Sequence, residues 1–303
     1  MDGPPTTVLL PTTTWTPACG EVAAQLGPDD ELLVVCDAED DPVAERPGLP
    51  AGVEVVAAGD PDGCSGKANA IDAGMERASH DRIVWTDDDF HHPDDWLETL
   101  HADYAEHGPV SEIPFFRGRD PLAVLLEPTN VFGGTVLTWA GDIAWGGGVI
   151  FERSDIDEDA FRRDLRRTVS DDGTLGEYLD VTTLRRVREV PAGGSLRETL
   201  ERHVRFIKLT RFHGPGVTVF SGLGLTAASA ACLLFPLRTL AVLTLLYAAM
   251  YAAFGIRRWT FLVAFPTTLA NVPLFAYALA RRTFVWGGRR YRWRSMFDVE
   301  IVG

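Results

Sequence analysis

Lysine is nearly absent from this chain of 303 residues, which holds only Lys67 and Lys208 and takes its remaining positive charge from arginine. Cysteine is also scarce. No two of the four cysteines stand at CxxC spacing, and Cys232 lies in an apolar stretch, which argues against a zinc site or a disulfide framework. The N-terminus lacks a basic region followed by a long apolar core, so no signal peptide is expected. A reduced, cytoplasmic setting fits these features.

Charge is distributed very unevenly along the chain. Residues 1–210 carry 41 of the 43 acidic residues and a net charge of −23, whereas residues 211–303 carry ten arginines and a net charge of +8. An acidic excess keeps proteins soluble at high salt, so we expect a haloarchaeal source. No nucleic-acid partner is expected, because the acidic part would repel phosphate backbones.

Short apolar strands alternate with helices in the first hundred residues. Strands are predicted over 7–11, 31–36, 53–57 and 82–85, and helices over 19–26 and 67–78. This alternation is typical of an α/β fold with a parallel sheet covered on both faces. In such sheets, ligands bind outside the carboxyl ends of the strands. The middle of the chain, from about 108 to 165, gives no comparably clear pattern.

Three uncharged segments follow residue 211, at about 214–237, 239–256 and 259–280. A membrane-spanning helix needs ~20 apolar residues, so two of the segments qualify and the second is marginal. We therefore predict a cytoplasmic catalytic domain over 1–210, a multi-pass cell-membrane region over 211–285 and a basic tail over 286–303. A buried core hairpin is the alternative interpretation.

The side of the tail depends on how many segments cross the membrane. Three crossings would place the arginine-rich tail outside, against the positive-inside rule. Two crossings plus a re-entrant or interfacial segment would keep the tail inside, which we favour. Pro266, Asn271 and Pro273 suit a broken third helix shielded by protein, although the marginal second segment is the other candidate.

Acidic residues follow two of the predicted strands. Asp87-Asp88-Asp89 comes directly after the strand 82–85, and Asp37 follows the strand 31–36. Carboxylates at a strand end provide the oxygen ligands of Mg²⁺, which is usually held by a few carboxylates and by substrate phosphates. In so acidic a chain, a solvated loop is the competing interpretation of the triplet, as a plain turn residue is for Asp37.

Three further segments carry candidate residues. A glycine-rich loop before Lys67 lacks Walker A spacing but would still place this lysine near a nucleotide. Asp171 or Asp172 would serve as a general base, or simply favour a helix N-terminus. Arg202 and Arg205 share one helical face and would hold either a diphosphate or lipid headgroups.

The order of these motifs resembles family 2 glycosyltransferases, specifically the ceramide-glucosyltransferase-like branch. That pattern has an early Asp, a DxD pair, a later Asp base and a (Q/R)xxRW motif before C-terminal membrane segments. The corresponding elements here are Asp37, the triplet with the sequence that follows it (DDDFHHPDDWL), the SDDGTLG segment, and RHVRF at 202–206. The WGGRRY stretch at 286–291 resembles the family's tail motif. Phe206 stands where the family has Trp.

The resemblance implies a GT-A fold, which is a Rossmann-like, mostly parallel sheet with flanking helices, followed here by C-terminal transmembrane helices. It also implies inverting transfer from a nucleotide sugar, here expected to be a UDP-sugar, to a membrane lipid acceptor. The implied site has Thr12, Asp37, Lys67 and Asp87 at the nucleotide sugar, Asp87 and Asp89 on Mg²⁺ or Mn²⁺, Asp172 as base, and Arg202 and Arg205 at the diphosphate or acceptor. Asp88 is expected to be dispensable.

Three alternatives stay open. The acceptor would be a polyprenyl phosphate if no strong base were needed. The protein would be a non-catalytic, sugar-nucleotide-binding membrane protein if its site were vestigial. A nucleotidyltransferase would use a similar sheet and similar acids, but would release pyrophosphate.

Overall fold

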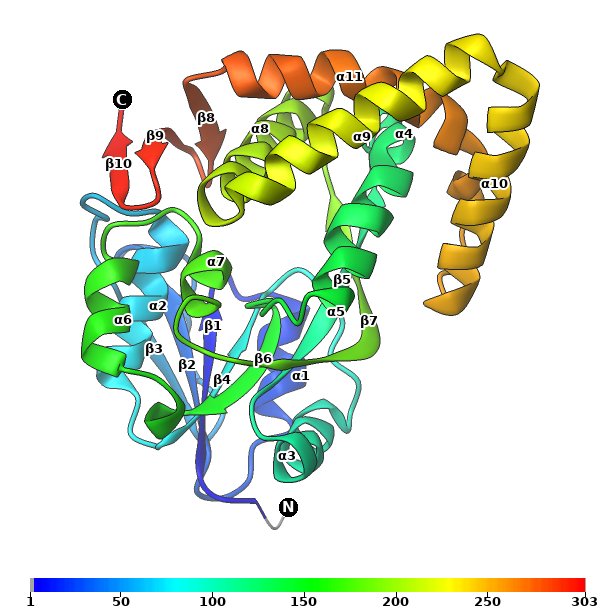
Figure 1. Cartoon of the computed structure of the whole chain (residues 1–303). Coiled ribbons are helices and arrows are strands. Elements are labelled where there is room, and N and C mark those ends of the chain that lie inside the picture. Colours follow the sequence, from blue (N-terminus) through cyan, green and yellow to red (C-terminus); the bar gives the residue numbers. More distant parts are fainter. Residues whose placement is uncertain (1–2, 303) are drawn as a thin grey trace. The chain divides into compact units, whose positions relative to one another are not determined.

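In the computed structural model, which describes residues 3–302, seven strands form one sheet in the order β3-β2-β1-β4-β6-β5-β7 (Figure 1). The strands are β1 (Thr6–Pro11), β2 (Glu31–Cys36), β3 (Val53–Ala57), β4 (Arg82–Thr86), β5 (Val110–Gly118), β6 (Gly148–Glu152) and β7 (Thr182–Ala192). The first four pair in parallel, and β6 runs antiparallel to both β4 and β5. The parallel strands are those that the sequence predicted, so the α/β prediction is confirmed.

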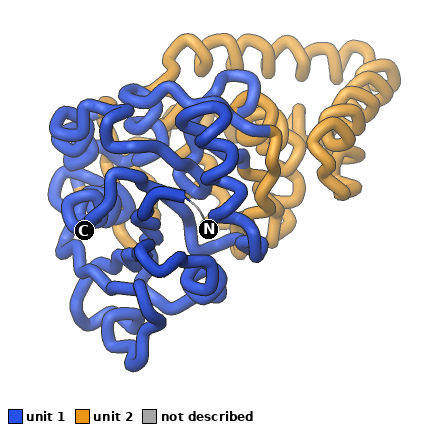
Figure 2. Tube along the Cα trace, turned by 90° about the horizontal axis from the view of Figure 1, so that it is seen from below, with its two compact units in different colours: residues 1–113, 139–184, 297–300 blue, residues 114–138, 185–296, 301–303 orange. Residues whose placement is uncertain are grey.

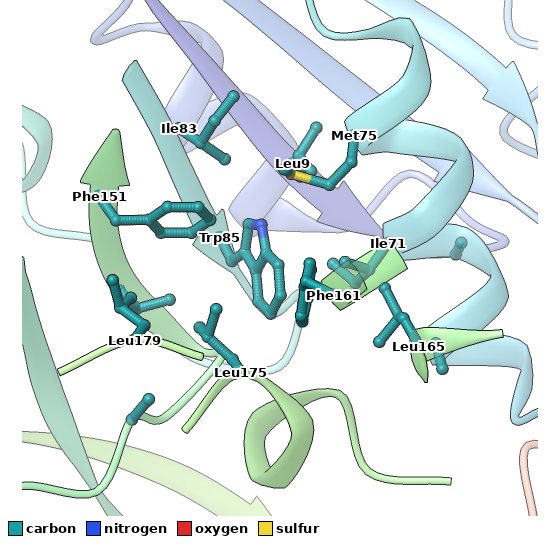
Figure 3. Close-up of a cluster of buried hydrophobic side chains, with 14 of the residues drawn as sticks. Leu9, Ile71, Met75, Ile83, Trp85, Phe151, Phe161, Leu165, Leu175 and Leu179 are labelled. Atoms are coloured by element: carbon teal, nitrogen blue, oxygen red, sulfur yellow. The ribbon is translucent and has the colours of Figure 1, made fainter. Parts of the chain in front are cut away.

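Helices cover both faces of this sheet. They are α1 (Pro17–Ala23), α2 (Gly66–Arg77), α3 (Trp96–His107), α6 (Glu158–Leu165) and α7 (Asp171–Leu175), with a short 3-10 turn η2 (Arg153–Asp155). Side chains alternate along β1, so that Leu9 packs with α2 and α6 on one face while its neighbours pack with α1 and α3 on the other. Trp85 is central to the first cluster, with ring centroids 5.6 Å from Phe151 and 5.8 Å from Phe161 (Figure 3).

The chain divides into two compact units (Figure 2). Unit 1 comprises the chain through residue 113 together with 139–184 and 297–300, and unit 2 comprises 114–138, 185–296 and the residues from 301 onwards. These limits differ from the sequence-based division at residue 210. The cause is helix α4 (Pro121–Asn130), whose one charged side chain is Glu127 and which packs against the C-terminal apolar helices.

Unit 2 is mainly helical. After α4 come a π-helix η1 (Val131–Val136) and α5 (Leu137–Ala140), which runs into unit 1. The later helices are α8 (Leu196–His213), α9 (Pro215–Leu234), α10 (Pro236–Ala253), the 3-10 helix η3 (Trp259–Val263) and α11 (Ala264–Ala280). Three short strands follow them, namely β8 (Thr283–Trp286), β9 (Arg289–Ser295) and β10 (Asp298–Ile301). Three segments are long and apolar enough to cross a membrane, namely α9, α10 and Trp259–Ala280. This finding matches the predicted apolar segments in number and position.

A buried ion pair fixes α4 inside unit 2. The Glu127 carboxylate is fully buried and accepts hydrogen bonds from the Arg258 guanidinium at 2.7 Å, from the Gly118 amide at 2.8 Å and from the Thr260 hydroxyl. Buried charges need such complete pairing, because desolvation of an unpaired charge is costly. The pair thereby attaches the connection between α10 and α11 to α4. The sequence pattern did not predict it.

Candidate functional site

Three predicted site residues follow neighbouring parallel strands. Thr12 comes after β1, Asp37 after β2 and Asp87 after β4, and the sheet order places β1 between the other two. The structure therefore brings these residues to one carboxyl edge, as predicted. The amide of Thr12 donates to the Val35 carbonyl at 2.9 Å, so the backbone is still held in register there. This edge is where α/β sheets bind ligands.

Lys67 joins two acidic segments that are far apart in the sequence. Its ammonium lies 2.5 Å from Asp87 Oδ1 and 3.1 Å from Asp171 Oδ2, and its side chain is 18% exposed. The start of α2 explains this position. The Ser65 hydroxyl accepts a hydrogen bond from the Ala68 amide, which caps the helix, and donates to the Val169 carbonyl at 2.8 Å. The lysine is thus held next to the segment that carries Asp171.

Electrostatics at this cluster raise the pKa of the lysine and of one acid. Burial alone would lower the pKa of Lys67, but the charges of Asp171, Asp87 and Asp172 outweigh it and raise the pKa well above its ordinary value. Burial and the neighbouring charge of Asp171 raise the pKa of Asp172 well above that of an ordinary carboxyl, although Lys67 opposes the shift. Perturbed groups of this kind cluster at functional sites.

The three acids of the triplet have different environments. Asp87 pairs with Lys67, whereas Asp88 Oδ2 accepts a hydrogen bond of 2.5 Å from the Thr12 hydroxyl, and Asp89 is exposed. Burial raises the pKa of Asp88, with the bond from Thr12 opposing it. Asp88 is therefore tied to the end of β1, so it anchors the loop that carries the other two acids. Its predicted dispensability stays a prediction.

The donor atoms at the triplet suit a hard divalent cation. Asp87 and Asp89 offer only carboxylate oxygens, and the Lys67 ammonium already occupies a cationic position beside Asp87. Within residues 3–302, no group of three or more His, Cys, Asp or Glu side chains is arranged to enclose an ion. Asp87 and Asp89 could therefore hold Mg²⁺ or Mn²⁺ only together with further oxygen ligands, such as the phosphates of a substrate.

A glycine-rich loop, Trp145–Gly148, lies against the acids of α7. A Cβ atom on Gly146 would stand 2.6 Å from Asp172 Oδ1 and 3.1 Å from Asp171 Oδ2. A side chain at position 146 would therefore displace the carboxylate of Asp172. Asp172 Oδ1 is buried and accepts no hydrogen bond from any residue that the structure describes. Asp172 thus carries a shielded oxygen facing the loop, while Asp171 holds Lys67.

A buried histidine connects the triplet to this loop and was missed from the sequence. His92 Nε2 lies 2.6 Å from the Thr86 hydroxyl, which donates to the Gly147 carbonyl at 3.0 Å. The His92 amide donates to Glu21 at 2.8 Å, and the ring stacks on Phe90 at 4.2 Å. The one signal in the sequence was the His91-His92 pair just after the triplet.

The two predicted arginines lie in α8 of unit 2. The Arg202 guanidinium is 4.3 Å from the ring centroid of Phe116 and 4.9 Å from that of Phe206. The Arg205 guanidinium is 4.0 Å from the ring centroid of Trp286. Phe206, which occupies the position where the family has Trp, thus contacts the Arg202 guanidinium with its ring. The predicted role of both arginines at a diphosphate stays a prediction.

Three solved structures illustrate the similarity to known folds. Glucosyl-3-phosphoglycerate synthase from Mycobacterium tuberculosis, in complex with Mn²⁺, UDP-glucose and phosphoglyceric acid, is 18% identical, with a TM-score of 0.33; the alignment covers 50% of this chain and 57% of that one, which is under two thirds. The same enzyme in complex with Mn²⁺ and UDP-glucose is 15% identical, with a TM-score of 0.42, and the alignment covers 68% of this chain and 78% of that one. S. aureus TarS is 12% identical, with a TM-score of 0.34, and the alignment covers 99% of both chains. No curated protein matches this chain.

The family comparison is more specific. Residues 18–130 match the model described as glycosyl transferase family 2, over 113 of the 303 residues. The matched segment contains Asp37, Lys67 and the triplet, whereas Asp172, Arg202 and Arg205 lie outside it. The match confirms the predicted resemblance to family 2 glycosyltransferases over these residues.

Proposed function

We propose that this protein is a membrane-anchored, inverting glycosyltransferase that moves a sugar from a nucleotide sugar to a membrane lipid. The observation that carries the proposal is the pairing of Lys67 with Asp87 and Asp171 beside Asp172, at the carboxyl edge of the sheet. This arrangement combines a site for a diphosphate with a candidate base. The family match over residues 18–130 supports the class of reaction.

The donor would lie across the ends of β2, β1 and β4. Asp37 would accept hydrogen bonds from the nucleoside, with Thr12 holding the triplet loop in place through Asp88. Asp87 and Asp89 would hold Mg²⁺ or Mn²⁺ together with the diphosphate. When bound, such an ion offsets the negative charge that develops on the leaving group. Lys67, which remains charged at neutral pH, would add a second positive charge there.

Asp172 would act as the base. The acceptor oxygen attacks the anomeric carbon as the bond from that carbon to the diphosphate oxygen breaks, and the acceptor's proton passes to Asp172. The nucleoside diphosphate leaves with the electron pair. Attack from the face opposite the leaving group inverts the configuration. The buried Oδ1 of Asp172 and the close approach of Gly146 support this assignment.

The apolar helices would hold the site at the membrane. The most apolar stretches of α9 and α10 are 17% and 6% buried, against 28% for that of Trp259–Ala280. Thr267 of α11 donates to the Leu125 carbonyl of α4. We infer that α9 and α10 cross the bilayer and that α11 does not. The catalytic region and the basic tail would then both be cytoplasmic.

The test is reconstitution of the purified protein with host lipid extract and a panel of nucleotide sugars, starting with UDP-sugars, in molar salt. We expect a labelled glycolipid and free nucleoside diphosphate, loss of both with EDTA, and recovery with Mg²⁺ or Mn²⁺. Asp172→Asn should abolish transfer, whereas Glu106→Gln, at an exposed residue of α3, serves as the control. Undiminished transfer in EDTA would refute the metal role of the triplet.

The same assay separates the alternatives. Transfer to added polyprenyl phosphate that survives Asp172→Asn would favour that acceptor, because its oxyanion needs no base. Release of pyrophosphate would indicate a nucleotidyltransferase. No turnover with any donor would indicate a non-catalytic protein. The structure of the lipid product would decide whether the ceramide-glucosyltransferase-like branch is correct, and activity that requires molar salt would support a haloarchaeal source.

A further inference from the structure

The surface of unit 1 is almost free of exposed large apolar side chains. Among the described residues of this unit, only Trp139 and Ile143 are both large, apolar and exposed, at 41% and 48%. All five residues from 139 to 143 are exposed. Single exposed apolar residues are normal, but two within residues 139–143, which comprise the end of α5 and the loop that follows it, are not accounted for by the core.

The conformation of this loop is fixed. Asp142 has a φ of 45°, in the left-handed region that non-glycine residues rarely adopt. Its carboxylate accepts a hydrogen bond of 2.9 Å from the Thr183 amide at the start of β7. Strained backbone of this kind is retained where the surroundings enforce it, and it is concentrated at functional sites.

The loop leads directly into the catalytic region. Two residues after Ile143, Trp145 is buried and its amide donates to the Ser111 hydroxyl at 2.9 Å. Gly146 follows and lies against Asp172. Ile143 is therefore only three residues along the chain from Gly146, which faces the proposed base Asp172.

We propose that residues 139–143 form a bilayer-contacting loop, which dips into the lipid surface and brings the lipid acceptor's headgroup to Asp172. This inference rests on the proposed function for the identity of the acceptor, but not for the membrane contact itself. Tryptophan is favoured at the boundary between headgroups and acyl chains. The loop would thus carry acceptor recognition that the family-matched segment, which ends at residue 130, does not include.

Charge favours an apolar contact over an electrostatic one for this part of the chain. Residues 1–210 carry a net charge of −23, so this part of the chain is repelled by anionic headgroups wherever salt does not screen it. High salt removes the repulsion but provides no attraction. Burial of apolar area, in contrast, does not depend on charge of either sign. Within unit 1, Trp139 and Ile143 are the side chains that can provide it.

Membrane contact is tested by fluorescence. The native cysteines are all buried, so a cysteine introduced at an exposed position reacts selectively with an environment-sensitive probe. The test variant is Ile143→Cys, and the control is Glu106→Cys, at an exposed residue of α3. The full chain is reconstituted in vesicles with nitroxide-labelled phospholipid. We expect blue-shifted emission and nitroxide quenching at position 143 and neither at 106. Unshifted emission without quenching at position 143 would overturn the proposal, whether or not the protein transfers sugar.

Acceptor delivery is tested by kinetics. The double variant Trp139→Gln/Ile143→Gln should lower transfer to a bilayer-embedded acceptor about tenfold. The reason is that glutamine loses the part of the burial free energy that these half-exposed apolar side chains would gain in lipid. The KM for the nucleotide sugar should not change. A chain with Trp139→Phe and the native Ile143 should recover transfer. Leu196→Gln, an exposed leucine on α8, is the matched control. Wild-type transfer by the double variant would overturn the acceptor role even if position 143 lies in lipid.

Discussion

Removing the charge of Lys67 should destabilise the protein strongly. The substitution Lys67→Met keeps the length of the side chain but leaves the carboxylates of Asp87 and Asp171, which now lie 2.5 and 3.1 Å from the ammonium, without a cation. The side chains involved are only 18%, 21% and 5% exposed, so water compensates poorly. Asp172 adds a third acidic group to the same cluster.

The magnitude follows from the burial of the pair. Breaking a buried ion pair by removing one partner costs about 3–5 kcal/mol. For a chain of this size that corresponds to a fall in Tm of roughly 6–15 °C. Because the folded protein raises the pKa of Lys67, this stabilisation is present at all pH values below the unfolded-state pKa and is lost only as pH rises through the folded-state pKa. The difference should therefore be complete at neutral pH.

Thermal unfolding in detergent, followed by intrinsic fluorescence from pH 4 to 9, measures the effect. The gap between wild type and Lys67→Met should be fully present at neutral pH and should persist to pH 9, because the raised pKa keeps Lys67 charged in the folded protein. The double variant Lys67→Met/Asp171→Asn should recover part of the loss, because it removes one of the uncompensated charges. Equal Tm values at neutral pH, or no recovery in the double variant, would refute the electrostatic account of this cluster.

Three other predictions follow from the same geometry. Transfer should fall as pH drops through the raised pKa of Asp172, at a higher pH than for an ordinary carboxyl, because the base must be ionised; a flat pH–rate profile would contradict this. Gly146→Ala should lower kcat at least tenfold, whereas Gly133→Ala, where a Cβ meets nothing within 4 Å, should not. Arg258→Met should lower Tm by leaving fully buried Glu127 unpaired, and Glu127→Gln in the same chain should restore part of it.

The parallel half of the sheet could be predicted from the sequence because its signals are local. Each of these strands is a run of five or six mostly apolar residues ended by a polar or turn residue, and such a run can be recognised without knowing which strand it pairs with. The same locality placed Thr12, Asp37 and Asp87 at one edge, since parallel strands of a doubly covered sheet share their carboxyl side. The bounds of β2 and β3 agree with the predicted ranges at every residue.

The remaining elements depend on contacts between distant segments. Strands β5 and β6 run antiparallel and lie beside each other in the sheet, although 29 residues separate Gly118 from Gly148. The sequence of α4 resembles that of an ordinary apolar helix, and only its packing in unit 2 shows that it belongs with the C-terminal apolar helices. The residue pattern alone did not separate the roles of Asp171 and Asp172, because neighbouring residues on a short helix differ only in which side chains they face; the choice of Asp172 came from the family resemblance.

The scarcity of lysine gains a physical meaning at this site. Arginine supplies nearly all the positive charge of the chain, yet Lys67 stands where carboxylates from β4 and α7 converge. A guanidinium directs its donors within one plane, whereas an ammonium is a compact point charge with rotatable donors. The compact ammonium of Lys67 contacts both Asp87 and Asp171. A lysine retained in a chain that otherwise uses arginine therefore indicates a position where the shape of the cation matters as much as its charge.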